Sequence, residues 1–142
     1  MNIRKYHPDE LDQLVDIWYQ GSLHAHNFIE QAYWQSQRKA MKETYLPMAE
    51  THVILADSEI VGFIAMVDNY LAAVFVKVAC QGKGYGKELL QFVKANRNHI
   101  QLKVYQKNKQ AVGFYLKQAF AICEELVDEP TGEKEYLLEW KK

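Results

Sequence analysis

Three alternating glycines, Gly82, Gly84 and Gly86, stand between an apolar, β-branched run and a segment whose leucines have helical spacing. Glycine allows a tight turn and the close approach of another group to the backbone. A loop of this kind that ends at a helix N-terminus presents several N–H groups to an anion. The alternative is an ordinary turn with positive φ, but three glycines in alternation favour an anion-binding loop.

Two common phosphate-binding patterns do not fit this loop. The P-loop pattern G-x-x-x-x-G-K-[ST] requires glycine where Gln81 stands and Ser or Thr where Glu88 stands. The dinucleotide pattern G-x-G-x-x-G, begun at Gly82, requires glycine where Lys87 stands, and no acidic residue follows at the required distance. The spacing therefore excludes both classes.

The elements around the loop predict an α/β fold. Alternating or β-branched apolar residues predict strands over about 2–6, 51–56, 60–67, 70–78, 100–105, 120–127 and 135–140. Helical spacing predicts one helix that begins at Pro8, one over 29–46 that stops at Pro47, one after the glycine loop, and one from Asn108 to about residue 118. Asp57-Ser58-Glu59 predicts a hairpin turn, whereas the strand–helix–strand crossover at 70–105 predicts a parallel pair. We therefore expect a single domain, 1–142, with a mixed central sheet of about six to seven strands and about four helices.

Two segments resemble the motifs of the GNAT N-acetyltransferase family. Gln81-x-x-Gly84-x-Gly86 fits the family signature [QR]-x-x-G-x-[GA]. Asn108-x-x-Ala111-x-x-Phe114-Tyr115-x-x-x-Ala119-Phe120 resembles N-x-x-A-x-x-F-Y-x-x-x-G-F. The resemblance covers the whole domain, and His26-Asn27-Phe28-Ile29 is similar to a segment in small bacterial members that modify peptide or protein amines. The chain departs from the family where Lys77 and Val78 replace a frequent Asp-Pro and where Ala119 replaces a usual glycine.

This resemblance implies the GNAT acyl-CoA N-acyltransferase fold and acetyl-CoA as the acyl-donor substrate. It implies that the strands near 70–78 and 100–105 splay apart around pantetheine, with main-chain hydrogen bonds from Phe75 and Val76. The pyrophosphate is expected at the amides of 82–87, and the implied cofactor-binding side chains and amides are those of Gln81, Gly82, Lys83, Gly84, Tyr85, Gly86, Lys87 and Asn108. Asn108 can also serve only as the cap of its own helix. The absence of Asp and Glu from 89–123 independently favours a polyanionic ligand.

Tyr115 matches the family tyrosine that stands near the CoA sulfur, so the resemblance implies a catalytic general acid there. Without the motif, the sequence would indicate only that Tyr115 is an aromatic residue packed on the sheet. His26, Phe28 and Tyr70 are candidates for acceptor binding. The general base is left open among His24, His26, Asp68, Tyr70 and water.

Composition narrows the class of partner. A net charge of −1 argues against nucleic-acid binding, and the lack of a long apolar run argues against a membrane span. The N-terminal residues lack the pattern of a signal peptide, so we expect a cytoplasmic protein, and two cysteines fit a reducing compartment. His24-x-His26 has no third ligand at a known spacing, so no metal is expected.

The favoured function is acetyl transfer from acetyl-CoA to a primary amine, such as a protein lysine or an N-terminal amine, by a monomer or homodimer. Acidic residues crowd 124–139, which suggests a cationic acceptor. The alternatives are a small-molecule amine acetyltransferase, acting on polyamines or aminoglycosides, and a non-catalytic acyl-CoA-binding module.

Overall fold

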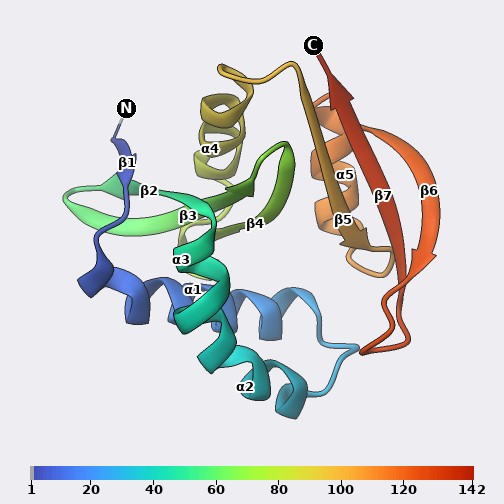
Figure 1. Ribbon diagram of the computed structural model, residues 1–142, viewed down its shortest axis with the longest axis horizontal. Helices are drawn as coiled ribbons and strands as arrows, with labels where there is room; N and C mark the ends of the chain where they lie inside the picture. The colour runs from blue at the N-terminus through green and yellow to red at the C-terminus, as the bar shows by residue number, and fades with distance from the viewer. Residues whose placement is uncertain (1) are drawn as a thin grey trace.

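The computed structural model describes residues 2–142 as one mixed seven-stranded sheet with helices on both faces (Figure 1). The strands are β1 (Ile3–Lys5), β2 (Glu50–Ala56), β3 (Glu59–Val67), β4 (Tyr70–Val76), β5 (His99–Tyr105), β6 (Ala121–Val127) and β7 (Lys134–Lys141). They lie in the order β1-β2-β3-β4-β5-β7-β6. The helices are α1 (Leu11–Ala25), α2 (Gln31–Ala40), α3 (Leu46–Met48), α4 (Tyr85–Lys94) and α5 (Lys109–Lys117). The predicted α/β fold with a mixed sheet is confirmed, and no helix within 2–142 is long and apolar enough to cross a membrane.

The turn between β2 and β3 follows directly from its sequence. Ala56 pairs with Glu59, so only Asp57 and Ser58 form the loop. Both have positive φ, 51° and 67°, as a two-residue turn of the type that matches strand twist requires. Short polar side chains tolerate this conformation best after glycine, and the predicted hairpin is confirmed.

The helix predicted over 29–46 extends slightly further than its sequence indicated. α2 continues through a π-helical segment, Met41–Tyr45, into α3, so Pro47 lies inside the last turn. The Leu46 N–H donates to the carbonyl of Met41, five residues back. This wider turn changes the hydrogen-bond register just before Pro47, which has no N–H to contribute.

Helices cover both faces of the sheet, and each face has its own apolar core. On one face α1 and α2 bury Leu14, Trp18 and Trp34 against Phe63 of β3. On the other face the core is built from α4, α5 and inward residues of the strands, including Leu89, Leu90, Tyr115, Ile64, Leu102 and Leu138. Because both of its faces are covered, β3 is buried at seven consecutive residues, Ile60–Met66.

The parallel pair of the sheet is short. β4 and β5 share one register pair, Tyr70 with Gln101, and then diverge (Figure 1). Each strand is held instead by its antiparallel partner, since β4 pairs with β3 along its length and β5 pairs with β7 from residue 99 to residue 105. The splay that the family resemblance implied is therefore a feature of this sheet.

Ala119 occupies a backbone conformation that favours glycine. Its φ is +70°, directly after α5, where a left-handed residue ends a helix. An alanine in this region costs about 1 kcal/mol relative to an unstrained conformation. The family's usual glycine and this chain's alanine thus adopt the same turn at different cost.

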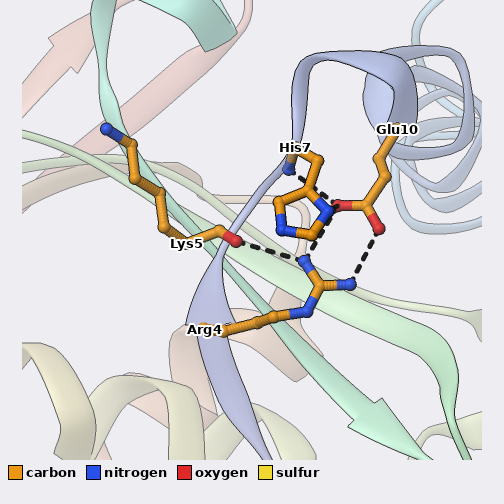
Figure 2. A network of polar contacts seen from close by, with 4 residues as sticks. All are labelled: Arg4, Lys5, His7 and Glu10. Atoms are coloured by element: carbon orange, nitrogen blue, oxygen red, sulfur yellow. Dashed lines mark hydrogen bonds and ion pairs between the residues drawn. The ribbon is translucent and has the colours of Figure 1, made fainter.

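The start of α1 is fixed to β1 by a compact polar network (Figure 2). The Arg4 guanidinium donates to both carboxylate oxygens of Glu10, at 3.0 and 2.8 Å, and the His7 backbone N–H donates to the same carboxylate at 2.8 Å. The Arg4 hydrogen bonds, with the His7 N–H, hold the pKa of Glu10 at about 2, well below its ordinary value. Pro8 precedes Glu10 in the short 3-10 turn, as a first-turn proline should.

This depressed pKa predicts the sign of a pH effect. The ionised Glu10 is favoured in the folded state, so its contribution is complete above about pH 5 and is lost as pH falls toward 2. We expect Glu10→Gln to lower the free energy of unfolding by about 1 kcal/mol at pH 7 and by nearly nothing at pH 2. Denaturant unfolding at a series of pH values measures this difference, with Glu59→Gln, at the exposed first residue of β3, as the control. A difference that stayed constant down to pH 2 would contradict the assignment.

Candidate active site

A cleft of about 670 Å³ opens where β4 and β5 diverge. Its walls come from both halves of the chain: from α1, β4, the glycine loop, β5, α5 and the start of β7. The lining includes most of the residues predicted to bind the donor or to act in catalysis, namely Phe75, Val76, Gln81, Gly82, Gly84, Tyr85, Gly86, Lys87, Asn108, Tyr115 and His26. Lys83, Phe28 and Tyr70 do not line it.

The register of β4 decides which of its backbone groups face the cleft. The Lys77 N–H donates to the carbonyl of Val61, and pairing alternates along an antiparallel ladder. Phe75 therefore turns its N–H and carbonyl toward β3, whereas Val74 and Val76 turn theirs toward the open side. In this geometry the N–H groups of Val74 and Val76, and not that of Phe75, lie on the side away from β3. Val74 was not among the residues predicted from the sequence.

Phe75 contributes its side chain to the site instead. The ring lies against Phe63, with centroids 6.0 Å apart, and it also fills the space beside Gly21 of α1. A Cβ at Gly21 would lie 2.7 Å from the Phe75 ring, so a larger residue there must displace the ring. Glycine at position 21 thus lets α1 approach the floor of the cleft.

The glycine loop has the geometry that its sequence predicted. Gly82 and Gly84 have φ of 79° and 89°, and Gly84 is the N-cap of α4. No side chain caps this N-terminus, so its first N–H groups remain available to an anion. The Gln81 amide donates to the Val76 carbonyl at 3.2 Å and fastens the loop to the end of β4. Lys87, in the first turn, adds a positive charge to the cleft wall.

Tyr115 reaches the cleft from α5. It is only 8% exposed and packs between the rings of Phe114 and Phe120, at 5.3 and 5.6 Å. Burial raises the pKa of the phenol far above its ordinary value, so the hydroxyl remains protonated at neutral pH. Within 2–142 this hydroxyl makes no hydrogen bond, which leaves it able to donate to a bound group.

Asn108 joins two distant parts of the chain across the cleft. Its Oδ1 accepts from the Ala111 N–H and caps α5, so its Nδ2 faces His26 and donates to Nε2 at 3.1 Å. His26 is 9% exposed, and burial lowers the pKa of this imidazole to about 4. The histidine is therefore neutral at physiological pH and holds the end of α1 to the start of α5. Of the two roles expected for Asn108, the helix cap is the one that this geometry displays.

An aromatic cluster surrounds His26. Its ring stacks on Trp34 at 5.3 Å and meets Tyr105 edge-on at 5.0 Å. Phe28 packs outside this layer, against His26 and Tyr105, and does not reach the cleft. Tyr70 lies at the start of β4, where the two strands still pair.

The candidates for a general base are dispersed. His24 is exposed at the rim of the cleft, and the Nε2 of His26 is engaged by Asn108. Asp68 lies in the exposed turn between β3 and β4, outside the cleft lining. Trp34, for which core packing was expected in preference to a place in an acceptor pocket, lines the cleft, and so does Tyr105, which the sequence did not indicate.

Comparison with known proteins identifies the family. The model for the acetyltransferase (GNAT) domain matches residues 7–130. The chain belongs to the GNAT family. Peptidyl-lysine N-acetyltransferase YiaC of Escherichia coli (strain K12) is 31% identical over 139 residues, which cover 97% of this GNAT chain and 95% of YiaC. Peptidyl-lysine N-acetyltransferase YjaB of Salmonella typhimurium (strain LT2) is 30% identical over 123 residues, covering 86% of this chain and 84% of YjaB.

Solved structures agree with this assignment. The solution structure of apo-form YjaB from Escherichia coli matches with a TM-score of 0.87 at 25% identity, covering 98% of this chain and 96% of that one. The PaiA N-acetyltransferase of Thermoplasma acidophilum in complex with coenzyme A matches in fold, with a TM-score of 0.84 at 23% identity and coverage of 99% and 98%. The resemblance drawn from the two motifs is confirmed, and this GNAT protein is an acetyl-CoA-dependent N-acetyltransferase.

The Asn108–His26 contact predicts a specific tautomer. Because Nε2 accepts from Asn108, the proton of neutral His26 must lie on Nδ1. We expect imidazole ¹H–¹⁵N spectra to show the Nδ1–H form at pH 7 and protonation only near pH 4. Asn108→Asp keeps an oxygen to cap α5 and places a carboxylate beside His26, so this variant should raise the His26 pKa. An Nε2–H tautomer at pH 7 in the unaltered protein would show that the contact is wrongly assigned.

Proposed function

We propose that this GNAT protein acetylates lysine side chains of peptides or proteins, with Tyr115 as the general acid. The observation that carries the proposal is the buried Tyr115 side chain, whose hydroxyl makes no hydrogen bond within 2–142, in the cleft beside the open edge of β4. The lysine acceptor is supported by the relatives YiaC and YjaB, which are peptidyl-lysine N-acetyltransferases.

The donor half of the cleft fits acetyl-CoA. Val74 would offer its main-chain N–H and carbonyl, and Val76 its N–H, to the pantetheine amides, since these groups face away from β3. The Val76 carbonyl already accepts from the Gln81 amide. The N–H groups at the start of α4 and the Lys87 ammonium would hold the pyrophosphate. The bound thioester supplies an acyl carbon that a neutral amine can attack directly, so that a C–N bond forms, the C–S bond breaks, and the amine releases its proton to water.

Tyr115 would act on the leaving sulfur. A general acid must be protonated before the reaction, and the raised pKa of Tyr115 guarantees that state over the physiological range. Its position is set by Phe114 and Phe120, whose rings hold the phenol at the cleft wall. The hydroxyl has no competing partner within 2–142, so its proton is available to the departing thiolate.

The acceptor would enter from the side of α1, α2 and β7. His26, Trp34 and Tyr105 form the wall there, and Phe28 supports that wall from behind. His26 would shape this entrance and take no proton, because its Nε2 is held by Asn108 and its pKa is lowered to about 4 by burial.

Tyr115→Phe tests the acid directly. Removing the hydroxyl should lower kcat about 100-fold with a lysine peptide as acceptor, because general acid catalysis contributes on that scale. The KM for acetyl-CoA should change by less than about twofold, since the ring and its packing remain. Release of free thiol under steady-state conditions measures both constants.

Tyr45→Phe is the matched control, because Tyr45 is exposed and lies outside the cleft lining. Equal kcat for Tyr115→Phe and the unaltered protein would remove Tyr115 from the mechanism. Acetyl-CoA binding without turnover of any amine would favour a non-catalytic acyl-CoA-binding module.

A further inference from the structure

Glu135 places a carboxylate in the acceptor side of the cleft. It is the second residue of β7, lies directly opposite Tyr105 of β5, and is half-buried. Among the described residues that line the cleft, it is the only Asp or Glu. The sequence alone does not distinguish Glu135, because seven acidic residues lie between positions 124 and 139.

The acidic neighbours of Glu135 are already engaged. Asp128 accepts hydrogen bonds from the Tyr105 hydroxyl at 2.9 Å and from the Thr131 hydroxyl at 2.7 Å. Glu133 pairs with Lys107 at 3.1 Å, and Glu139 contacts His99 at 2.7 Å. These contacts fix the β6–β7 hairpin beside the cleft and engage the carboxylates of Asp128, Glu133 and Glu139.

The Glu135 carboxylate has no such partner within residues 2–142. It accepts no side-chain hydrogen bond and forms no ion pair, although Lys103 also lines the cleft. Burial and the negative charge of Asp128 raise the pKa of Glu135, and the positive charge of Lys103 offsets this only in part. A partly desolvated carboxylate without a cation is stabilised when a cation binds beside it.

The wall next to Glu135 is aromatic. Tyr105 stands opposite it in the sheet, and the rings of His26 and Trp34 continue from Tyr105 at 5.0 and 6.5 Å. Aromatic surfaces of this kind pack against a methylene stem and also attract an ammonium group. The combination suits a cation at the end of an aliphatic chain better than an α-amine, which has no stem.

We propose that Glu135 and the aromatic wall of His26, Trp34 and Tyr105 form the acceptor site, which recognises a primary ammonium on an unbranched aliphatic stem. This inference rests on the proposed function and names the group that selects its substrate. Peptidyl lysine and free polyamines share this chemistry, so the experiment has an arm for each.

Steady-state kinetics with a capped lysine tripeptide form the first test. Glu135→Gln should lower kcat/KM for this acceptor about tenfold, mainly through its KM, as expected for loss of one charge-assisted contact. The KM for acetyl-CoA should remain within about twofold, because Glu135 belongs to β7, paired with Tyr105, and not to the glycine loop. Replacing lysine by diaminopropionate, with a shorter stem, should lower kcat/KM of the unaltered protein to a similar extent.

Glu124→Gln is the control, since Glu124 is an exposed acid of the same hairpin and does not line the cleft. It should leave every constant unchanged. Equal loss in Glu124→Gln and Glu135→Gln would assign the effect to general surface charge and overturn the site. Spermidine in place of the peptide tells the two sources apart, because the true acceptor is the one whose kcat/KM is higher and depends on Glu135.

Equilibrium binding separates this inference from the enzymatic proposal. A tripeptide with norleucine in place of lysine keeps the aliphatic stem but lacks the ammonium. Calorimetry of the CoA-bound protein should show the lysine peptide or spermidine binding about tenfold more tightly than this norleucine peptide, and Glu135→Gln should abolish the preference. A preference that survives in Glu135→Gln, or is absent from the unaltered protein for both amines, overturns the site. A Glu135-dependent preference without turnover would support the site while contradicting the proposed function.

Discussion

The divergence of β4 and β5 is the constraint on which the site depends. Two adjacent parallel strands ordinarily join their backbone N–H and C=O groups in hydrogen bonds along their length, but here the pairing ends after Tyr70 and Gln101. Antiparallel partners on the outer sides keep both strands in place, so the inner edges can separate without loss of the fold. The backbone groups of Val74 and the N–H of Val76 thereby face the cleft, where the proposed function places the pantetheine of acetyl-CoA.

Side-chain packing keeps the cleft between β4 and β5 open. The cores on the two faces of the sheet are separate, and α1 closes on the floor of the cleft only because Gly21 leaves room for the Phe75 ring. At the wide end, the hydrogen bond from Asn108 to His26 ties the α1–α2 connection to α5. One side of the cleft therefore has the backbone amides of the glycine loop and the positive charge of Lys87. The other side has aromatic rings and the Glu135 carboxylate.

The local features of the fold and of the site could be predicted from the sequence. Gly82 and Gly84 require positive φ, Asn108 caps a helix, and the Asp57-Ser58 pair forms a two-residue turn, because each depends on neighbouring residues alone. What sequence did not predict depends on pairing across the chain. That the backbone of Val74 faces away from β3, whereas that of Phe75 faces β3, follows from hydrogen-bond alternation along the ladder. The position of Glu135 follows from the register of β7 on β5.

The central claim is that the splayed strands and the glycine loop form an acetyl-CoA site. Thermal unfolding with and without about 1 mM acetyl-CoA tests it most directly, because a ligand that binds only the folded state must raise Tm. The account predicts a clear rise with acetyl-CoA and none with ATP or NAD at the same concentration. No rise with acetyl-CoA, or an equal rise with ATP, would mean that the loop is a turn or a general anion site, and would contradict the account.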